Sequence, residues 1–134
     1  MKVCVCVDEN GGRTFLGKRQ SRDTRLISDL CAYARGARLL AHPYSAPLFG
    51  AGEAVFLEDY LMCAQETDVC FCEREALLPY KEKITELVVY RWGRRYPFDT
   101  VLDFEPEEAG FVLKMRTEFE GKSHECIVRE VYGK

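Results

Sequence analysis

The sequence predicts a single three-layer α/β domain with a mostly parallel sheet and a C-terminal antiparallel β-hairpin. Short apolar runs typical of buried strands alternate with segments of helical periodicity along the first two thirds of the chain. Two longer β-type segments then close the chain around "EGKS". The 134 residues are 47% apolar, which is enough to bury one core, so we expect one domain over residues 1–134.

The first segment is predicted to lie in the middle of the sheet. Residues 2–7, "KVCVCV", are β-branched and Cys-rich without polar alternation, which favours a strand buried on both faces. "DENGG" (8–12) is typical of a turn. Residues 13–22 have no clean period and carry four basic side chains, so we expect a loop there.

A helix is predicted over residues 24–35, where apolar side chains recur at helical spacing. Either Asp23 or Ser21 provides its N-cap, because both side chains can accept hydrogen bonds from the first free amides. Gly36 ends the helix, since glycine readily takes the left-handed conformation that follows a last turn.

The middle of the chain is short. Residues 37–45 are predicted to form a strand that Pro43 stops, because proline cannot donate to a sheet ladder. A loop over 46–53 follows, and 53–65 carry apolar residues on one side of a second predicted helix.

The rest of the sheet comes from four segments. Residues 68–73 and 86–92 are apolar runs that suit buried strands, and a broken helical segment over 74–85 connects them. Residues 110–121 and 124–133 form the closing hairpin.

Composition limits the partners and the compartment. The net charge is −3, from 19 basic and 22 acidic residues, which disfavours nucleic acid as a partner. The six-residue apolar run near Met1 is too short for a signal peptide or a membrane span, so we expect a cytoplasmic protein without a membrane partner. The seven cysteines are then predicted to be free thiols.

No metal or hydrolase motif is found by spacing. His42 and His124 lie far apart, and no metallohydrolase pattern surrounds either, so we predict no metal site. None of the serines stands in a nucleophile-elbow context: Ser21, Ser28, Ser45 and Ser123.

Four segments, in this order, resemble parts of dihydrofolate reductases. "VCVCVDENGG" resembles the first strand and turn of that family, and "SDLCAY" (28–33) resembles the helix with its active-site acid. "DTVLDF" after "LVVYRW" resembles the family's Asp-Thr-x-Phe-Pro segment, and residues 111–132 resemble its C-terminal hairpin. The resemblance implies a dihydrofolate-reductase-like fold, a pterin site and NADPH as cofactor.

The chain departs from this family where NADPH would be held. Glu73 and Arg74 replace a Gly-Gly pair that lets the backbone approach a pyrophosphate. "RQSRD" (19–23) replaces a Pro-Trp, and the middle is too short for the family's adenosine-holding strands. We therefore expect a shortened, divergent member that is not an active reductase, and NADPH binds only under the alternative interpretation.

The resemblance implies roles for an acid and a hydroxyl. Asp29 matches the acid on the helix, and Tyr90, nine residues before Asp99, matches the strand hydroxyl that supports it. A buried acid of this kind can relay a proton, so Asp29 and Tyr90 are the candidate catalytic residues. The alternative is that Asp29 lies on the solvent side of an amphipathic helix.

Two Cys-x-Cys pairs lie on strands that are neighbours in the resembled fold, so the pairs could face each other. Sulfur atoms ~6.5–7 Å apart along a strand fit a tetrahedral zinc site poorly. Buried small side chains are the favoured interpretation. Cys6 and Cys72 remain candidate thiols at the mouth of the cleft.

Basic side chains gather in two loops that border one cleft in the resembled fold. With neighbouring aromatic side chains they form a candidate site for an anionic ligand. The candidate ligand-binding residues are Arg19, Arg22, Arg25, Tyr44, Trp92, Arg94 and Arg95. A solvated surface balanced by acidic residues is the alternative.

Three functions follow in order of preference. The first is a domain without reductase activity that binds an anionic small molecule or partner. The second is an NADPH-dependent reductase of a pterin- or flavin-like substrate, and the third is a nucleic-acid-binding protein using both Arg clusters. A shortened middle also leaves an exposed sheet edge, which a homodimer would cover.

Overall fold

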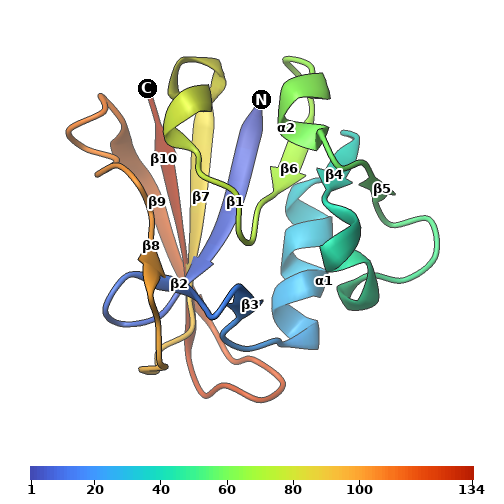
Figure 1. The fold of residues 1–134 in the computed structure, drawn as a ribbon. Helices are drawn as coiled ribbons and strands as arrows, with labels where there is room; N and C mark the ends of the chain where they lie inside the picture. Colours follow the sequence, from blue (N-terminus) through green and yellow to red (C-terminus); the bar gives the residue numbers. More distant parts are fainter.

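A computed structural model describes all residues from Met1 to Lys134, and its main feature is a seven-stranded sheet in the order β5-β4-β6-β1-β7-β10-β9 (Figure 1). Pairing is parallel from β5 to β7 and antiparallel between β7, β10 and β9. The predicted α/β class, with a mostly parallel sheet and a C-terminal hairpin, is confirmed. The strands are β1 (Lys2–Val7), β4 (Leu39–Ala41), β5 (Val55–Phe56), β6 (Val69–Phe71), β7 (Glu86–Arg91), β9 (Val112–Phe119) and β10 (Ile127–Gly133).

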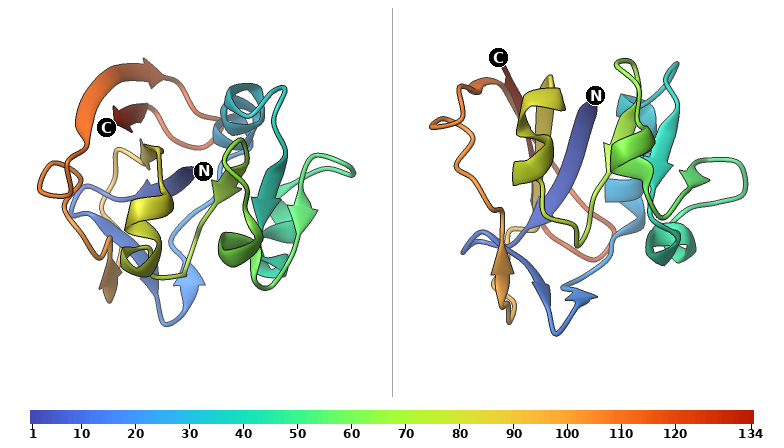
Figure 2. Two further views of the ribbon diagram at one scale, coloured as in Figure 1. Left: turned by 90° about the horizontal axis from the view of Figure 1, so that it is seen from above. Right: turned by 45° about the horizontal axis from the view of Figure 1, so that its top comes forward.

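The sheet is covered on both faces, as the buried runs in β1 and β7 require. Side chains alternate along each strand, so Val3 and Val5 pack on one face and Cys4 packs on the other. One face is covered by α1 (Thr24–Tyr33). The other is covered by α2 (Tyr60–Cys63), the 3₁₀ helix η2 (Leu78–Lys83) and the segment up to Phe111. Figure 2 shows α1 and η2 on opposite sides of β1.

A second, three-stranded sheet corrects the loop prediction for residues 13–22. It consists of β3 (Lys18–Arg19), β2 (Gly12–Phe15) and β8 (Thr100–Val101) in that order. Thr14 and Thr100 join β2 to β8 through their hydroxyl groups, 2.5 Å apart. Strands of two to four residues are too short to show alternation, so their pairing depends on contacts that are distant in sequence.

The predicted helix over 53–65 is largely wrong. Only Tyr60–Cys63 is helical, and Val55–Phe56 pairs with β4 as the edge strand β5. Asp59 precedes α2 without making a side-chain cap, and hydrogen bonding to the sheet edge replaces helical pairing over the first residues. The predicted strand over 37–45 is likewise reduced to Leu39–Ala41, and the 3₁₀ helix η1 (Pro43–Leu48) follows it.

The carboxyl ends of β1, β4, β6 and β7 meet at one end of the sheet, because these strands are parallel. The β2–β3 hairpin, the start of α1 and the turn between β9 and β10 gather at the same end, at the bottom of Figure 1. The buried carboxylate of Asp8 organises it by accepting hydrogen bonds from the amides of Asn10, Gly12 and Tyr96. None of the helices is long and apolar enough to cross a membrane.

Candidate functional site

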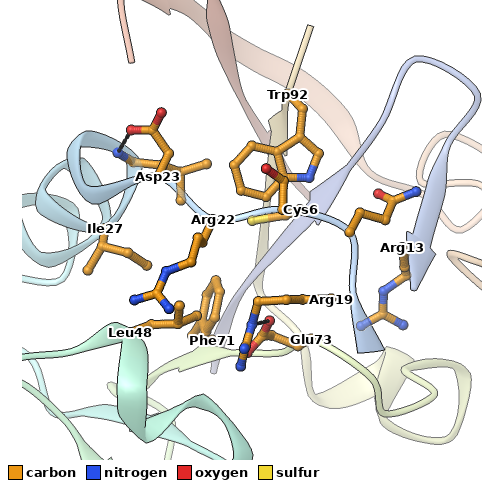
Figure 3. A pocket seen from close by; sticks show the side chains of 13 residues that line it. Cys6, Arg13, Arg19, Arg22, Asp23, Ile27, Leu48, Phe71, Glu73 and Trp92 are labelled. Atoms are coloured by element: carbon orange, nitrogen blue, oxygen red, sulfur yellow. Dashed lines mark hydrogen bonds and ion pairs between the residues drawn. The ribbon is translucent and has the colours of Figure 1, made fainter. Parts of the chain in front are cut away.

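A narrow pocket opens at the carboxyl ends of β1, β6 and β7 (Figure 3). Ligands of open α/β sheets usually bind at this edge, where successive strands lie on opposite sides of the first one. The space between the pocket walls is about 380 Å³, including the part open to solvent, but only about 20 Å³ of it admits the centre of a water molecule. An occupant would therefore be small, or would move the side chains at the rim.

The floor of the pocket is apolar. Cys6, Phe71 and Trp92 line it from the three strands, and α1 and η1 complete it with Leu26, Ile27 and Leu48. Burial, followed by the nearby charge of Glu73, raises the pKa of the Cys6 thiol well above its ordinary value. Cys6 is thus placed at the cleft, but as an apolar wall and not as a reactive thiolate.

Arg13 carries a buried positive charge on one side of the pocket. Its residue is 6% exposed, and its guanidinium donates to the carbonyls of Glu75 and Cys72 and to the Cys72 sulfur. No carboxylate pairs with it, and its Nε has no hydrogen-bond partner. A buried charge without a counterion is costly, so Arg13 is a natural partner for an anion.

Arg19 is occupied by a carboxylate. Its Nε and Nη2 donate to the two oxygens of Glu73 at 2.8 and 3.0 Å, and Ser45 donates to the same carboxylate at 2.7 Å. Burial opposes the Arg19 charge, but the hydrogen bond and ion pair with Glu73 raise its pKa. The charge of Glu73 is therefore balanced by Arg19 within the protein.

Arg22 is the free cation of the pocket. Its side chain makes no hydrogen bond or ion pair, and it projects from the segment before α1 (Figure 3). Three arginines line the pocket against two carboxylates, Glu73 and Asp23, and both carboxylates are held by internal partners. The net charge of the lining therefore favours an anionic occupant.

Asp23 ties the start of α1 to the turn between β9 and β10. It caps the helix by accepting from the amides of Arg25 and Leu26, and it also accepts from the amides of Lys122 and Ser123. Burial opposes its ionisation, but the Lys122 amide, the His124 ring and two further amides lower the pKa of Asp23 well below its ordinary range. Of the two predicted caps, Asp23 is the one observed.

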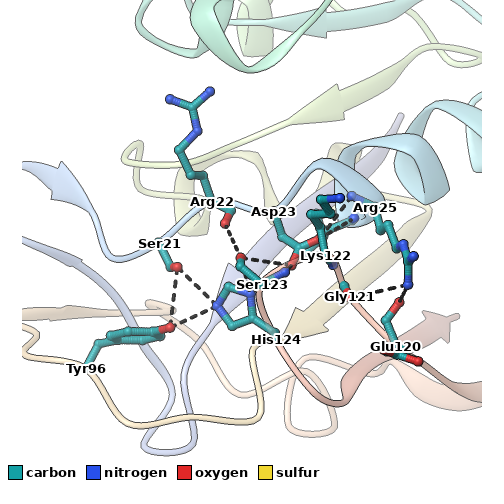
Figure 4. Close-up of polar contacts among 11 residues, drawn as sticks. Ser21, Arg22, Asp23, Arg25, Tyr96, Glu120, Gly121, Lys122, Ser123 and His124 are labelled. Carbon is teal, nitrogen blue, oxygen red and sulfur yellow. Dashed lines mark hydrogen bonds and ion pairs between the residues drawn. The ribbon is translucent and has the colours of Figure 1, made fainter.

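His124 extends this network to two hydroxyl groups (Figure 4). Its Nδ1 lies 2.9 Å from Asp23 Oδ2, and its Nε2 lies 3.1 Å from Ser21 Oγ and 2.8 Å from the Tyr96 hydroxyl. The ring is 3% exposed and stacks on Trp92, with 4.8 Å between ring centroids. Ser21 and Asp23 also line the pocket, so this network forms part of its wall.

The predicted pair Asp29 and Tyr90 lies outside this pocket. The Tyr90 hydroxyl donates to Asp29 at 2.7 Å, so the two side chains are in contact as the resemblance implied. Arg129 from β10 binds both oxygens of Asp29, at 2.6 and 2.7 Å. The carboxylate is therefore held in an ion pair with Arg129.

The two Arg clusters do not converge. Arg94 and Arg95 line no pocket with Arg22, and Arg95 pairs with Glu9 on the surface. Arg25 is exposed and donates weakly to the carbonyls of Glu120 and Gly121. The loop after β7 contributes Trp92 to the pocket, whereas Arg94 and Arg95 do not line it.

Tyr44 is not free to stack on a ligand base. Its hydroxyl accepts from the Arg19 amide, and the guanidinium groups of Arg19 and Arg74 lie 4.3 and 3.8 Å from its ring. Both cations are attracted to the aromatic face and occupy it. Tyr44 therefore supports Arg19 at the edge of the pocket.

The two Cys-x-Cys pairs face opposite sides of the sheet, so the expectation that they face each other is wrong. Val3 is aligned with Cys70 and Cys4 with Phe71, an offset of one residue that sends Cys4 and Cys70 to different faces. Cys72 lies on the face opposite Cys6, against Arg13, and burial raises the pKa of its thiol. Cys72 thus lies outside the pocket that Cys6 lines. No cluster of metal-ligating side chains is present.

The sequence did not reveal Ser21, Asp23 and His124 as members of one site. His124 is 101 residues from Asp23 and 103 from Ser21 along the chain, so no local spacing reveals their contact. The only local signal was the capping position of Asp23. Burial of Arg13 could not be read from a segment that lacks periodicity.

A wider groove lies on the other face of the sheet, lined in part by Val7, Leu102 and Phe104. Its one arginine, Arg91, is paired with Glu130 at 2.5 Å. The groove therefore offers no unpaired cation to an anionic ligand, and the pocket with Arg13 and Arg22 is the better candidate site.

No family model matches the chain, and no curated protein matches its sequence.

Proposed function

We propose that this protein is a divergent dihydrofolate-reductase-like domain that binds a small anionic molecule in the pocket between Arg13 and Arg22. Two observations support the architecture: β1 and β6 are neighbours, and Tyr90 contacts Asp29, as the resemblance implies. The absence of matching relatives makes the site itself the basis of the functional proposal.

The net positive charge of the pocket lining, with Arg22 unpaired and the Arg13 charge lacking a carboxylate, carries the binding proposal. An anion in the pocket would offset this charge and would also attract the free side chain of Arg22. The apolar floor of Phe71, Trp92 and Ile27 suits a ligand with a small apolar body. The ligand class is therefore a small carboxylate or phosphate ester with an apolar group.

The position of Glu73 weighs against a dinucleotide. Its side chain and that of Arg19 occupy the carboxyl end of β6, where a pyrophosphate would need close backbone approach. Reductase activity with NADPH is the alternative function. The binding experiment distinguishes it from anion binding because NADPH is one of the probes.

Thermal unfolding with defined probes tests the proposal. Phenyl phosphate and benzoate should raise Tm, whereas benzyl alcohol should not, because the alcohol lacks the charge. A ligand at 100 times its dissociation constant stabilises the fold by ~2.7 kcal/mol. NADPH is tested separately, and a saturable rise in Tm with NADPH would favour the reductase function instead.

Arg22→Gln should remove most of the anion-dependent rise without a large change in the Tm of the free protein, because Arg22 has no internal partner. Arg35→Gln is the matched control, since Arg35 is also exposed and the net charge changes equally. Equal loss of binding in both variants, or no rise with either anion, would refute the proposal.

A further inference from the structure

The network beside the pocket has the geometry of a nucleophile, a base and an orienting acid. Ser21 Oγ, His124 Nε2, His124 Nδ1 and Asp23 Oδ2 follow one another at contacts of 3.1 and 2.9 Å (Figure 4). A hydroxyl at this distance can transfer its proton to an imidazole as it attacks. We infer that Ser21 is the nucleophile of an ester- or thioester-hydrolysing site, with His124 as general base and Asp23 as its positioning residue.

Asp23 fixes the tautomer of His124. Its carboxylate accepts several amide hydrogen bonds and is therefore ionised, so it can only accept from the adjacent Nδ1. The Nδ1 proton then points to Asp23, and Nε2 presents its lone pair to Ser21. This is the arrangement in which a histidine removes a hydroxyl proton.

Two further groups contact the His124 ring. The buried carboxylate of Asp23 faces Nδ1, and the face of Trp92 stacks on the ring at 4.8 Å with an interplanar angle of 28°. An aromatic face attracts a cation, and both partners are shielded from water. An imidazolium formed during attack would therefore face a carboxylate and an aromatic ring.

Tyr96 competes for the same lone pair and can also assist. Its hydroxyl lies 2.8 Å from Nε2 and 3.4 Å from Ser21 Oγ. When Tyr96 donates to Ser21, Ser21 donates to His124, and the nucleophile is oriented. Ser21 lines the pocket and Tyr96 does not, so Ser21 is the hydroxyl that meets a bound substrate.

Backbone amides next to Ser21 are available to stabilise an oxyanion. The amides of Ser21, Arg22 and Asp23 donate no hydrogen bond within the protein. The amide that follows a nucleophile commonly contributes to an oxyanion hole, and here it belongs to Arg22, which directly precedes the N-cap Asp23 of α1. The positive end of the helix dipole adds to this stabilisation.

The substrate class rests on the anion binding proposed above. The substrate is a small ester or thioester that carries a carboxylate or phosphate, with this charge held by Arg22 and Arg13. The narrow pocket limits its acyl group to a few atoms.

Ser21 Oγ bonds to the carbonyl carbon while its proton passes to His124, and the leaving alcohol or thiol departs with that proton. Water then attacks the acyl-enzyme, returns a proton to Ser21 through His124, and releases the acid.

Covalent labelling tests the nucleophile directly. Diisopropyl fluorophosphate should add one diisopropylphosphoryl group to the folded protein, and peptide mapping should place it on Ser21. Ser21→Ala should show no adduct, whereas Ser45→Ala should label normally. Ser45 is a suitable control because it donates to Glu73 and not to a histidine. An adduct elsewhere, or none on the folded wild-type protein, would overturn the assignment.

Hydrolysis of two probes separates this inference from the binding proposal. Mono-4-nitrophenyl succinate, which is anionic, should be hydrolysed with a kcat/KM ~10-fold or more above that of 4-nitrophenyl acetate, a difference of ~1.4 kcal/mol. Arg22→Gln should remove this preference, and Ser21→Ala should abolish both activities above background. Both probes are measured in a Cys63→Ser, Cys126→Ser background, because these exposed thiols also react with activated esters.

The two proposals fail in different ways. Anion-dependent stabilisation without Ser21-dependent hydrolysis would overturn the nucleophile and leave anion binding intact. Ser21-dependent hydrolysis without a preference for the succinate would leave the nucleophile and overturn the anionic substrate class.

The positioning role of Asp23 has its own readout. Asp23→Asn, measured where it is fully folded, should lower kcat for the succinate by ~10²-fold or more with little change in KM, because the tautomer of His124 is lost while binding is not. A change confined to KM or to stability would show a purely structural role.

Discussion

The Tyr90 hydroxyl donates a 2.7 Å hydrogen bond to Asp29, and Arg129 binds the same carboxylate from the next strand. The three side chains join α1, β7 and β10, so they form a polar contact across the face of the sheet that α1 covers. Asp29 has two partners, whereas the Tyr90 hydroxyl has only Asp29. This difference in the number of partners determines how much stability each substitution should remove.

Tyr90→Phe should lower the free energy of unfolding by ~1 kcal/mol, because one hydrogen bond is lost and Arg129 still neutralises Asp29. Asp29→Asn should lower the free energy of unfolding by ~2–3 kcal/mol, since it leaves Arg129 partly buried without its carboxylate. Urea titration at pH 7 measures both, and a smaller cost for Asp29→Asn than for Tyr90→Phe would contradict this account.

Acid should weaken the protein through Asp23. Its pKa is lower in the folded state than in the unfolded chain, where it is ~3.9, so the folded protein binds fewer protons and stability is fully present only above that value. Stability should fall as pH decreases from ~5 through the folded-state pKa. Asp23→Asn should lose this component, so its difference from wild type, ~3 kcal/mol at pH 7, should shrink in acid. A difference independent of pH would exclude the charged carboxylate as the cause.

Gly121 is packed too closely to accept a side chain. An added Cβ would lie 2.6 Å from Asp23 Oδ2 and 2.7 Å from Ile127 Cδ1. Gly121→Ala should therefore lower stability by ~1–3 kcal/mol through overpacking. Gly133→Ala is the matched control, because its nearest neighbour is the flexible Lys114 side chain at 3.2 Å. Calorimetry should show a clear loss of Tm only for the first variant.

The cysteines should react with Ellman's reagent in an order set by exposure. Cys63 and Cys126 are exposed and should react within the native state. Cys31 should react slowly, because burial raises its pKa to about 11. The four sheet thiols should react only after unfolding in guanidinium chloride, and fast native reaction of Cys6 would contradict its role as an apolar wall.

The homodimer expected from the sequence has a different available edge. β5 at the shortened side is only two residues long, whereas β9 is an eight-residue edge strand with Val112, Leu113 and Met115 exposed. Long exposed edges favour pairing with a second copy. Light scattering should give twice the 15.4 kDa chain mass, and Met115→Lys should shift it towards one chain. A mass of one chain for the wild-type protein at high concentration would refute the prediction of a homodimer.

The central strands could be predicted because their information is local. The apolar runs of β1, β6 and β7 are long enough to indicate burial on both faces, and the C-terminal hairpin has its own turn. The β2–β3–β8 sheet could not be predicted, since each strand is too short to show a period. Whether Cys4 and Cys70 lie on the same face of the sheet depends on the strand register. An offset of one residue places them on opposite faces.

The candidate site could be predicted only in part. Arg19, Arg22 and Trp92 were expected at one cleft and do line one pocket. Arg94 and Arg95 were expected there too, but the direction of a loop after a strand is set by its contacts and not by its composition. The partnership of Ser21 with His124 requires knowledge of which distant turn packs on the start of α1.

The link between Asp23 and the β9–β10 turn has a consequence for the order of assembly. The first wall of the pocket is made early in the chain, and the turn that completes it lies about one hundred residues later. Closing so long a loop is slow compared with forming α1 or a single hairpin. We expect the pocket to be the last part of the protein to become ordered, only after β10 has joined β7. During synthesis it would stay incomplete until the residues of β10 had left the ribosome.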